Sequence, residues 1–82
     1  MIDIKTETEN NFLIISVKGE ADASSSIHLD QAIREAIDQG NTNILVDCNQ
    51  LNYISSAGLG VFMSYIEEIS EKSIHFILFG LS

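Results

Sequence analysis

The sequence has few basic residues and a single cysteine. Four lysine and arginine residues stand against twelve aspartate and glutamate residues, and the net charge of −8 repels phosphate backbones and anionic lipid headgroups. We therefore expect no binding to nucleic acid and none to a membrane surface. One cysteine excludes an internal disulfide, and Cys48 follows the apolar run 44–46, which predicts a small side chain in a buried strand.

The chain also lacks the features of secreted and membrane proteins. It has neither a basic start followed by an apolar segment nor an apolar run of about 18 residues, so we expect no signal peptide, no transmembrane helix and a cytoplasmic location. The hydrophobic content of 45% and the charged content of 20% lie close to the globular average. We expect one small domain over residues 1–82, with no repeat and no linker.

The amino-terminal half predicts a hairpin and a helix. Residues 2–5 alternate weakly between apolar and polar, and residues 12–17 form a stronger strand that Gly19 closes. Residues 10–11 (NN) supply turn chemistry between the two strands. An amphipathic helix follows from the capping serines at 24–26 to Gly40, because its apolar residues recur at helical spacing.

The second half predicts a strand, a helix and a final strand. Residues 44–48 are typical of an interior strand covered on both faces. Residues 74–79 are strand-like and end at Gly80. The helix between them has one apolar face, formed by Leu59, Phe62, Met63, Ile66 and Ile69. The order β-β-α-β-α-β favours a mixed sheet, in which an antiparallel hairpin joins parallel strands connected by helices.

Few residues are suited to acid–base or metal chemistry. His75 lies within the last strand between apolar neighbours, which is typical of a structural or surface role, and His28 is an ordinary residue of a first helical turn. The spacings HExxH, CxxC and the EF-hand loop do not occur. We therefore expect a protein that is not an enzyme and that carries no metal and no cofactor.

Residues 51–62 (LNYISSAGLGVF) form the most informative segment. Two hydroxyls and two glycines stand where a strand turns into a helix, although a helical glycine costs about 1 kcal/mol relative to alanine. One interpretation is an ordinary helix start, with Ser55 or Ser56 as the N-cap and with Gly58 and Gly60 allowing close packing. The other is a phosphate-cradling turn, although this segment has no lysine and no longer glycine-rich span of a P-loop.

Residues 55–60 (SSAGLG), preceded by 44–47 (ILVD) and by 19–22 (GEAD), resemble the STAS domain of bacterial anti-sigma factor antagonists. The resemblance covers essentially the whole chain and implies an α/β fold with a mixed β-sheet and packed helices. It also implies phosphorylation by a cognate anti-sigma factor that is a serine kinase. Matched by position, the phosphoacceptor is Ser56, with Ser55 as the runner-up. The partner-binding residues that it implies are Glu20, Asp22, Ser55, Ser56, Ala57, Gly58 and Leu59.

The sequence departs from the family pattern in two places. The family commonly has Asp before the acceptor, so with Ser55 here any contribution of that carboxylate to kinase recognition or loop geometry is absent. The family domain also continues after the last strand with a helix, a strand and a helix, so we expect a C-terminally short version of the fold. Large side chains in residues 76–79 would then lack cover on at least one face, which predicts self-association as a homodimer.

The resemblance implies a phosphorylation-controlled protein-binding switch in transcription regulation. The unphosphorylated form would bind the anti-sigma factor kinase and free a sigma factor, the phosphorylated form would be released, and a phosphatase would reset it. A phosphoryl group adds about −1.5 to −2 charges, which a partner surface would have to desolvate. Two alternatives remain open: a scaffold-type STAS domain of a sensory assembly, and a small nucleotide- or phosphate-binding module built on residues 58–60.

Overall fold

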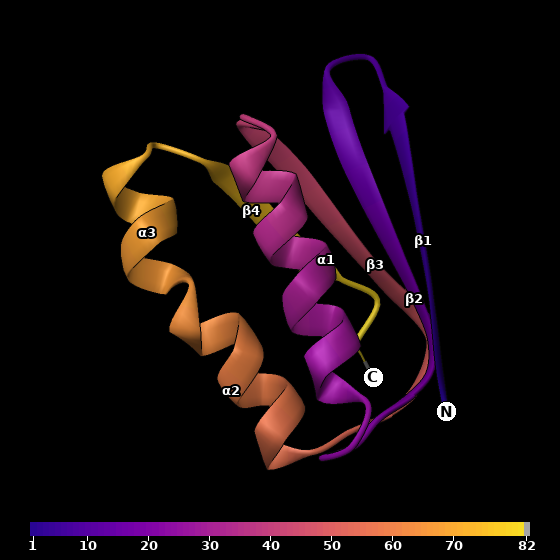
Figure 1. Cartoon of the computed structure of the whole chain (residues 1–82). Coiled ribbons are helices and arrows are strands. Elements are labelled where there is room, and N and C mark those ends of the chain that lie inside the picture. Colours follow the sequence, from indigo (N-terminus) through magenta and orange to yellow (C-terminus); the bar gives the residue numbers. More distant parts are fainter. Residues whose placement is uncertain (82) are drawn as a thin grey trace.

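Residues 1–81, which the computed structural model describes, form a four-stranded sheet with three helices on one of its faces (Figure 1). The strands are β1 (Ile2–Glu9), β2 (Phe12–Ala21), β3 (Asn43–Ile54) and β4 (His75–Phe79). The helices are α1 (Ser26–Asp38), α2 (Ser56–Ser64) and α3 (Ile66–Glu71). None of the helices within this described part is long and apolar enough to cross a membrane.

The sheet is mixed, and its strands lie in the order β1-β2-β3-β4. β1 and β2 form the predicted antiparallel hairpin, and Asn10 and Asn11 adopt φ values of 50° and 71° at its turn. Asparagine tolerates this left-handed region better than most residues, which is why it suits tight hairpin turns. β2 pairs with β3 and β3 with β4 in parallel, through crossovers that contain the helices. The predicted element order and the mixed pairing are confirmed.

Two strands run further than the hydrophobic pattern predicts. Gly19 does not end β2: with φ at +101° it lies beside a register shift, so the strand bulges there and continues to Ala21. β3 continues past the apolar residues 44–48 to Ile54, because its later residues pair with the bulged part of β2. Both extensions bring the strand ends to the start of α2.

The hydrophobic core lies between the sheet and the helices. Burial alternates along β2 and β3, and α1 turns its predicted apolar face inward. The fully or largely buried side chains here are Leu13, Ile15, Val17, Ala21, Leu29, Ile33, Ala36, Ile37, Ile44, Val46, Cys48, Leu51, Tyr65 and Ile74. The predicted burial of Cys48 is confirmed, and burial, reinforced by the neighbouring Asp47, raises the pKa of its thiol to about 11.

The other face of the sheet carries no helix within residues 1–81 (Figure 1). Along β3, Ile44 and Val46 are buried, whereas Leu45 and Asp47 on the opposite face are half-buried. The prediction of a strand covered on both faces is therefore wrong for the described residues. In so short an apolar run only one side chain, that of Leu45, points to the outer face. One apolar residue there does not tell whether that face is covered.

The predicted second helix is divided at Tyr65 into α2 and α3. The Tyr65 side chain is buried, and its hydroxyl donates a hydrogen bond to the backbone carbonyl of Asp30 at 3.1 Å and also contacts the Asp30 carboxylate. Met63 lies two residues earlier, roughly 200° around a helix, so burying Tyr65 turns Met63 outward, where it is 67% exposed. Leu59 and Ile66 are exposed as well, so the predicted apolar face is not buried at these three positions.

An ion-pair cluster attaches α3 to α1. The Arg34 guanidinium donates to both oxygens of Glu68, at 2.6 and 3.0 Å, and also reaches Asp38 at 3.2 Å. Lys72 lies 2.7 Å from the same Glu68 carboxylate. The hydrogen bonds from Arg34 and then Lys72 lower the pKa of Glu68 to about 2. The cluster holds α3 beside α1 and so supports the orientation of α2.

Candidate functional site

Ser55 and Ser56 have different roles at the start of α2. Ser55 is the N-cap: its backbone is extended, and its Oγ accepts a hydrogen bond from the Gly58 N–H at 3.2 Å. Ser56 is the first residue of the helix and is exposed, and its hydroxyl has no hydrogen-bond partner among residues 1–81. Of the two serines, the structure thus uses Ser55 for capping and leaves the Ser56 hydroxyl accessible.

Ser55 caps the helix although the family motif commonly has Asp at this position. Ser and Asp are both favoured N-caps, because each offers an oxygen to the free N–H groups of the first turn. Ser55 therefore preserves the capped loop geometry where the family motif has Asp, and the change removes a negative charge without removing the cap.

The loop after β2 and the start of α2 lie against each other. The Ser55 N–H donates to the Ala21 carbonyl at 2.9 Å, and Ala21 and Glu20 pair with Ile54 and Tyr53. This junction is the result of the two strand extensions that the hydrophobic pattern did not predict. It places residues 19–22 (GEAD) beside the SSAGLG segment, as the family resemblance implies. The first three of these residues belong to β2, and only Asp22 lies in the loop that the resemblance implies.

Gly58 is buried at this junction. A Cβ there would lie 2.8 Å from Cγ1 of Ile54 and 3.1 Å from the carbonyl oxygen of Ala21. The close-packing interpretation is therefore correct for Gly58, because a side chain would collide with the neighbouring strand ends. It is wrong for Gly60, since a Cβ there would meet nothing within 4 Å.

Asp22 is held rigidly within the loop. Its carboxylate accepts hydrogen bonds from the backbone N–H groups of Ser24 and Ser25 at 3.1 and 2.9 Å and from the Ser24 hydroxyl at 2.9 Å. The hydrogen bond from the Ser24 hydroxyl, followed by those from Ser25, lowers the pKa of Asp22 to about 2. Asp22 is therefore a fixed negative charge at neutral pH in the loop that adjoins Ser56.

The predicted partner-binding residues gather at one end of the sheet. Ser56, Ala57 and Leu59 are exposed on α2, and Glu20 is exposed at the end of β2, whereas the buried Gly58 determines shape rather than offering contact. Tyr53, which sequence analysis did not single out, is 54% exposed at the same end and pairs with Glu20. Its signal was weak, because Tyr53 belongs to the part of β3 beyond the apolar run.

The geometry does not favour a phosphate-cradling loop. Residues 58–60 lie inside the first turns of α2 instead of forming an open glycine-rich turn, and the Gly58 N–H is already bound by Ser55. The described part of the chain also contains no group of three or more His, Cys, Asp or Glu side chains placed to hold a metal ion.

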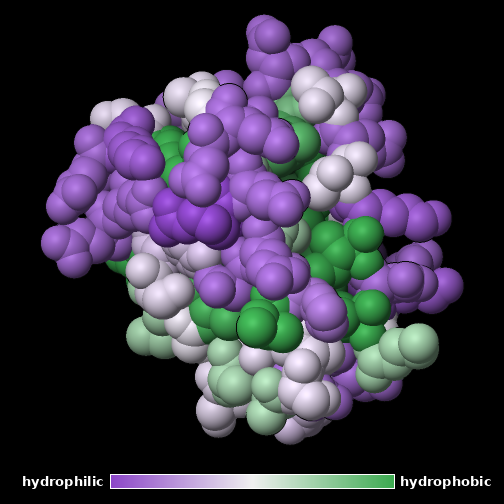
Figure 2. Space-filling model, viewed as in Figure 1, coloured by the Kyte–Doolittle hydropathy of each residue, from purple (hydrophilic) through white to green (hydrophobic). Residues whose placement is uncertain are grey.

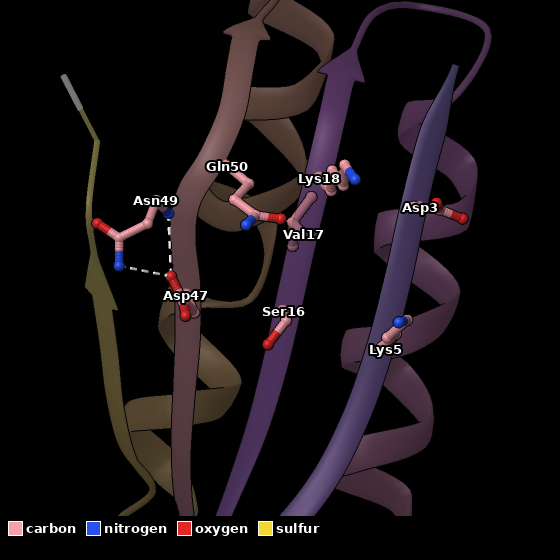
Figure 3. Close-up of a pocket in the computed structure, with 8 residues that line it drawn as sticks. All are labelled: Asp3, Lys5, Ser16, Val17, Lys18, Asp47, Asn49 and Gln50. Carbon is pink, nitrogen blue, oxygen red and sulfur yellow. Dashed lines mark hydrogen bonds between the residues drawn. The ribbon is translucent and has the colours of Figure 1, made fainter.

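A polar hollow of about 270 Å³ lies on the face of the sheet away from the helices (Figure 3). Asp47 accepts hydrogen bonds there from the backbone and the side chain of Asn49 at 2.9 and 2.8 Å. The charged residues of the hollow are two aspartates and two lysines, so it does not favour an ion of either sign. They are Asp3, Lys5, Lys18 and Asp47.

An apolar groove of about 560 Å³ runs between β4 and the pair α2–α3. Phe76 and Leu78, predicted to lack cover on at least one face, lie half-buried in it, and Phe62 packs on Phe76 with ring centroids 6.4 Å apart.

Hydrophilic residues cover α3 and the end of α1, while hydrophobic ones gather towards α2 and the start of α1 (Figure 2). In this view, the end of the molecule that bears α2 is the more apolar one.

The sequence of this chain is similar to those of known proteins. The family model described as the STAS domain matches residues 3–82. The anti-sigma-B factor antagonist of Staphylococcus aureus (strain NCTC 8325 / PS 47) is 25% identical over 81 residues, which are 99% of this chain and 75% of that protein. The anti-sigma-B factor antagonist of Listeria monocytogenes serovar 1/2a is 30% identical over 81 residues, covering 99% of this chain and 70% of that protein.

Solved structures show the same fold. An anti-sigma factor antagonist from Mycobacterium paratuberculosis superposes with a TM-score of 0.86 at 22% identity, over 95% of this chain and 66% of that one. The anti-sigma factor antagonist SpoIIAA in its unphosphorylated form gives a TM-score of 0.80 at 24% identity, over 98% of this chain and 74% of that one. The phosphorylated form of Bacillus SpoIIAA gives a TM-score of 0.78 at the same identity and coverage. This chain spans from 66% to 75% of the length of these proteins.

Proposed function

Because this chain belongs to the STAS domain family, we propose that it is an anti-sigma factor antagonist whose binding to an anti-sigma factor is switched off by phosphorylation of Ser56. The observation that carries the proposal is the division of roles at the helix start. Ser55 is occupied as the cap, whereas Ser56 presents a free hydroxyl at the exposed first residue of α2. The curated relatives named anti-sigma-B factor antagonists and a similar structure of a phosphorylated antagonist support this assignment.

The free protein should tolerate a phosphoryl group at Ser56. The first N–H groups of a helix lack partners within the helix, and the helix dipole favours an anion there. Ser55 occupies the Gly58 N–H, so the N–H groups of Ser56 and Ala57 remain for phosphate oxygens. The first turn of α2 also contains no acidic residue that would repel the group. Phosphorylation should therefore leave the fold intact.

The penalty falls on the complex. A phosphoserine carries about −1.5 to −2 charges at neutral pH, and a partner surface that fits a neutral hydroxyl would have to desolvate them. Asp22 already makes the adjoining loop negative, so the added charge increases repulsion from any acidic group of the partner. Desolvating such an ion costs several kcal/mol, which corresponds to at least about 100-fold in affinity.

In the proposed cycle the chain is a substrate and not an enzyme. The partner is an anti-sigma factor that is also a serine kinase, and a phosphatase returns the chain to its binding form. Glu20 at the end of β2, Asp22 on the loop that follows, and Ala57 and Leu59 around Ser56 provide the contact surface. Tyr53 extends this surface along the end of β3.

The test combines a kinase assay with binding measurements. The probe is a purified anti-sigma factor serine kinase, incubated with the chain and ATP, with the product mapped by mass spectrometry. We expect one phosphate, on Ser56, and at least about 100-fold weaker binding of the phosphorylated chain by calorimetry. Ser56→Ala should stay unmodified and bind constitutively, and Ser56→Asp should bind more weakly than the unmodified chain.

Ser64→Asp is the matched control, because it adds the same charge at the other end of α2. It should leave partner affinity and phosphorylation unchanged. Phosphate on Ser55 would refute the site assignment. A bound, active kinase that leaves the chain unmodified would favour the scaffold alternative instead, and failure of the unmodified chain to bind would refute the antagonist function.

A further inference from the structure

The uncovered face of the sheet carries an apolar patch. Ile14, Leu45 and Ile77 are direct neighbours in register across β2, β3 and β4, on the face away from the helices. Phe12 and Phe79, each 38% exposed, extend the row in opposite strand directions, and Ile77 is 51% exposed. We call these five residues the open-face patch. Proteins rarely leave a contiguous apolar patch in water without a binding role.

Charged residues of β1 border the patch in a defined order. Glu9, Glu7 and Lys5 pair with Phe12, Ile14 and Ser16 of β2, so each belongs to a known row of the sheet. They share the open face, because side chains alternate along a strand and Ile2 and Ile4 turn towards the core. Figure 3 shows Lys5 on this face, with the helices behind the sheet. The open-face charges beside the patch are therefore negative at Glu9, negative at Glu7 and positive at Lys5.

We propose that the open-face patch binds a second copy of this chain face to face, about a two-fold axis that crosses the strands at the row of Glu7, Ile14, Leu45 and Ile77. This axis reverses the strand direction, so Ile14, Leu45 and Ile77 meet their own counterparts. Glu7 likewise faces Glu7 of the partner subunit at the exposed edge, where the like charges weaken the association. Each copy of Lys5 then lies opposite Glu9 of the partner subunit, and two ion pairs form at the edge. An axis parallel to the strands would instead place Glu7 and Lys5 over Ile77 and Phe79 of the partner subunit, where the charges would be desolvated without partners.

The size and charge of the patch predict a weak dimer. Strands lie about 4.8 Å apart and same-face residues about 6.7 Å apart, so the whole contact face of three rows across four strands, which contains the open-face patch and the β1 charges, covers roughly 400 Å² of flat area in each copy. That is about half of a standard interface. Each copy also has a net charge of −8, so association should strengthen as salt screens the repulsion. The helices, and Ser56 with them, remain on the outer sides of the dimer, so the proposed switch does not depend on it.

Sedimentation equilibrium between about 20 μM and about 1 mM tests the association, since an interface this small is at the weak end of specific complexes. We expect a monomer–dimer equilibrium that shifts towards dimer with salt. Ile77→Glu should weaken association at least about 10-fold, because it desolvates two unpaired charges. Lys5→Glu and Glu9→Lys should each weaken it about 3-fold or more, and the double variant with both changes should restore it to within about 2-fold.

Lys18→Glu is the matched control, because it makes the same charge change on the same face as Lys5→Glu. In the proposed dimer Lys18 falls opposite the hairpin turn of the partner subunit. Association of this variant should therefore stay within about 2-fold of that of the unmodified chain. Circular dichroism of every variant checks that the fold is retained. A monomer throughout the concentration range would overturn the proposal. Failure of the Lys5–Glu9 exchange to restore association would overturn the two-fold axis. Dissociation by Ile66→Glu, in the groove beside β4, but not by Ile77→Glu would also overturn it.

Discussion

Two glycines of α2, two residues apart, should respond oppositely to the same substitution. Gly58→Ala places a methyl group 2.8 Å from Cγ1 of Ile54, 3.1 Å from the carbonyl oxygen of Ala21 and 3.3 Å from its Cβ. The Ala21 carbonyl has little freedom to move, because it accepts the Ser55 N–H at 2.9 Å. Gly60→Ala adds the same methyl group in the same helix, with nothing within 4 Å.

The difference can be estimated from two opposing effects. Replacing a helical glycine by alanine gains up to about 1 kcal/mol from backbone entropy, and Gly60→Ala should stabilise by roughly that amount. At Gly58 overpacking costs typically 1–3 kcal/mol, which exceeds the gain, so Gly58→Ala should destabilise by about 1 kcal/mol. Gly58→Val should cost about 2 kcal/mol or more, since it adds two further methyl groups and a β-branch.

Thermal melts followed by circular dichroism measure the effect. A change of 1 kcal/mol shifts Tm by about 4–8 °C in a domain of this size, so the two alanine variants should melt at least about 8 °C apart, Gly58→Ala lower. A domain of this size has about 4–12 kcal/mol of stability, so both variants should remain folded at room temperature. If Gly58→Ala raises Tm as much as Gly60→Ala does, then the close approach of α2 to the strand ends is not limiting and the reasoning fails.

Three further perturbations test the capping and the charges. Ser55→Ala should destabilise the fold by about 1 kcal/mol in urea denaturation, whereas Ser55→Asp, which keeps an acceptor oxygen, should cost much less; equal losses would contradict the capping role. Asp22 has a folded pKa of about 2 against an ordinary value of 3.8, so its contribution is present above about pH 4 and is lost as pH falls towards 2. Tm should therefore fall as pH is lowered from about 4 towards 2, and this fall should be smaller in the Asp22→Asn variant. Burial, with the bond to Asp30, raises the pKa of Tyr65 from 10.0 to about 12, so its contribution is complete below pH 10 and is lost as pH rises through 12. Tyr65→Phe should flatten the alkaline limb of a plot of Tm against pH, and an unchanged limb would contradict this assignment.

Local patterns in the sequence determined most of the secondary structure. The hairpin was predictable from residues 10–11 between two strand-like segments, because asparagine suits the left-handed turn that the structure contains. The inward face of α1 was predictable because helical spacing brings Leu29, Ile33 and Ile37 onto one side. The SSAGLG segment marked the candidate site, because a strand-to-helix turn with two hydroxyls and costly glycines is unusual.

Tertiary contacts decided what those patterns left open. Both Ser55 and Ser56 could have capped α2; Ser55 does so because its N–H is bound to Ala21 and its Oγ reaches Gly58, contacts that exist only once β2 and β3 pair. The break at Tyr65 likewise depends on Asp30, 35 residues away.

The open face of the sheet was also determined partly by local sequence and partly by tertiary structure. Alternation in the sequence determined that Ile14, Leu45 and Ile77 point away from Ile15, Val46 and Leu78, since strand side chains alternate whatever surrounds them. Whether a helix covers them depends on which side of the sheet the crossovers pass. In the described chain α1, α2 and α3 all pass on one side, so the three residues form an exposed row on the other. A hydrophobic pattern specifies which side chains share a face, but the cover of that face is a relation between segments far apart in the chain, and the packing of the helices on the sheet decides it.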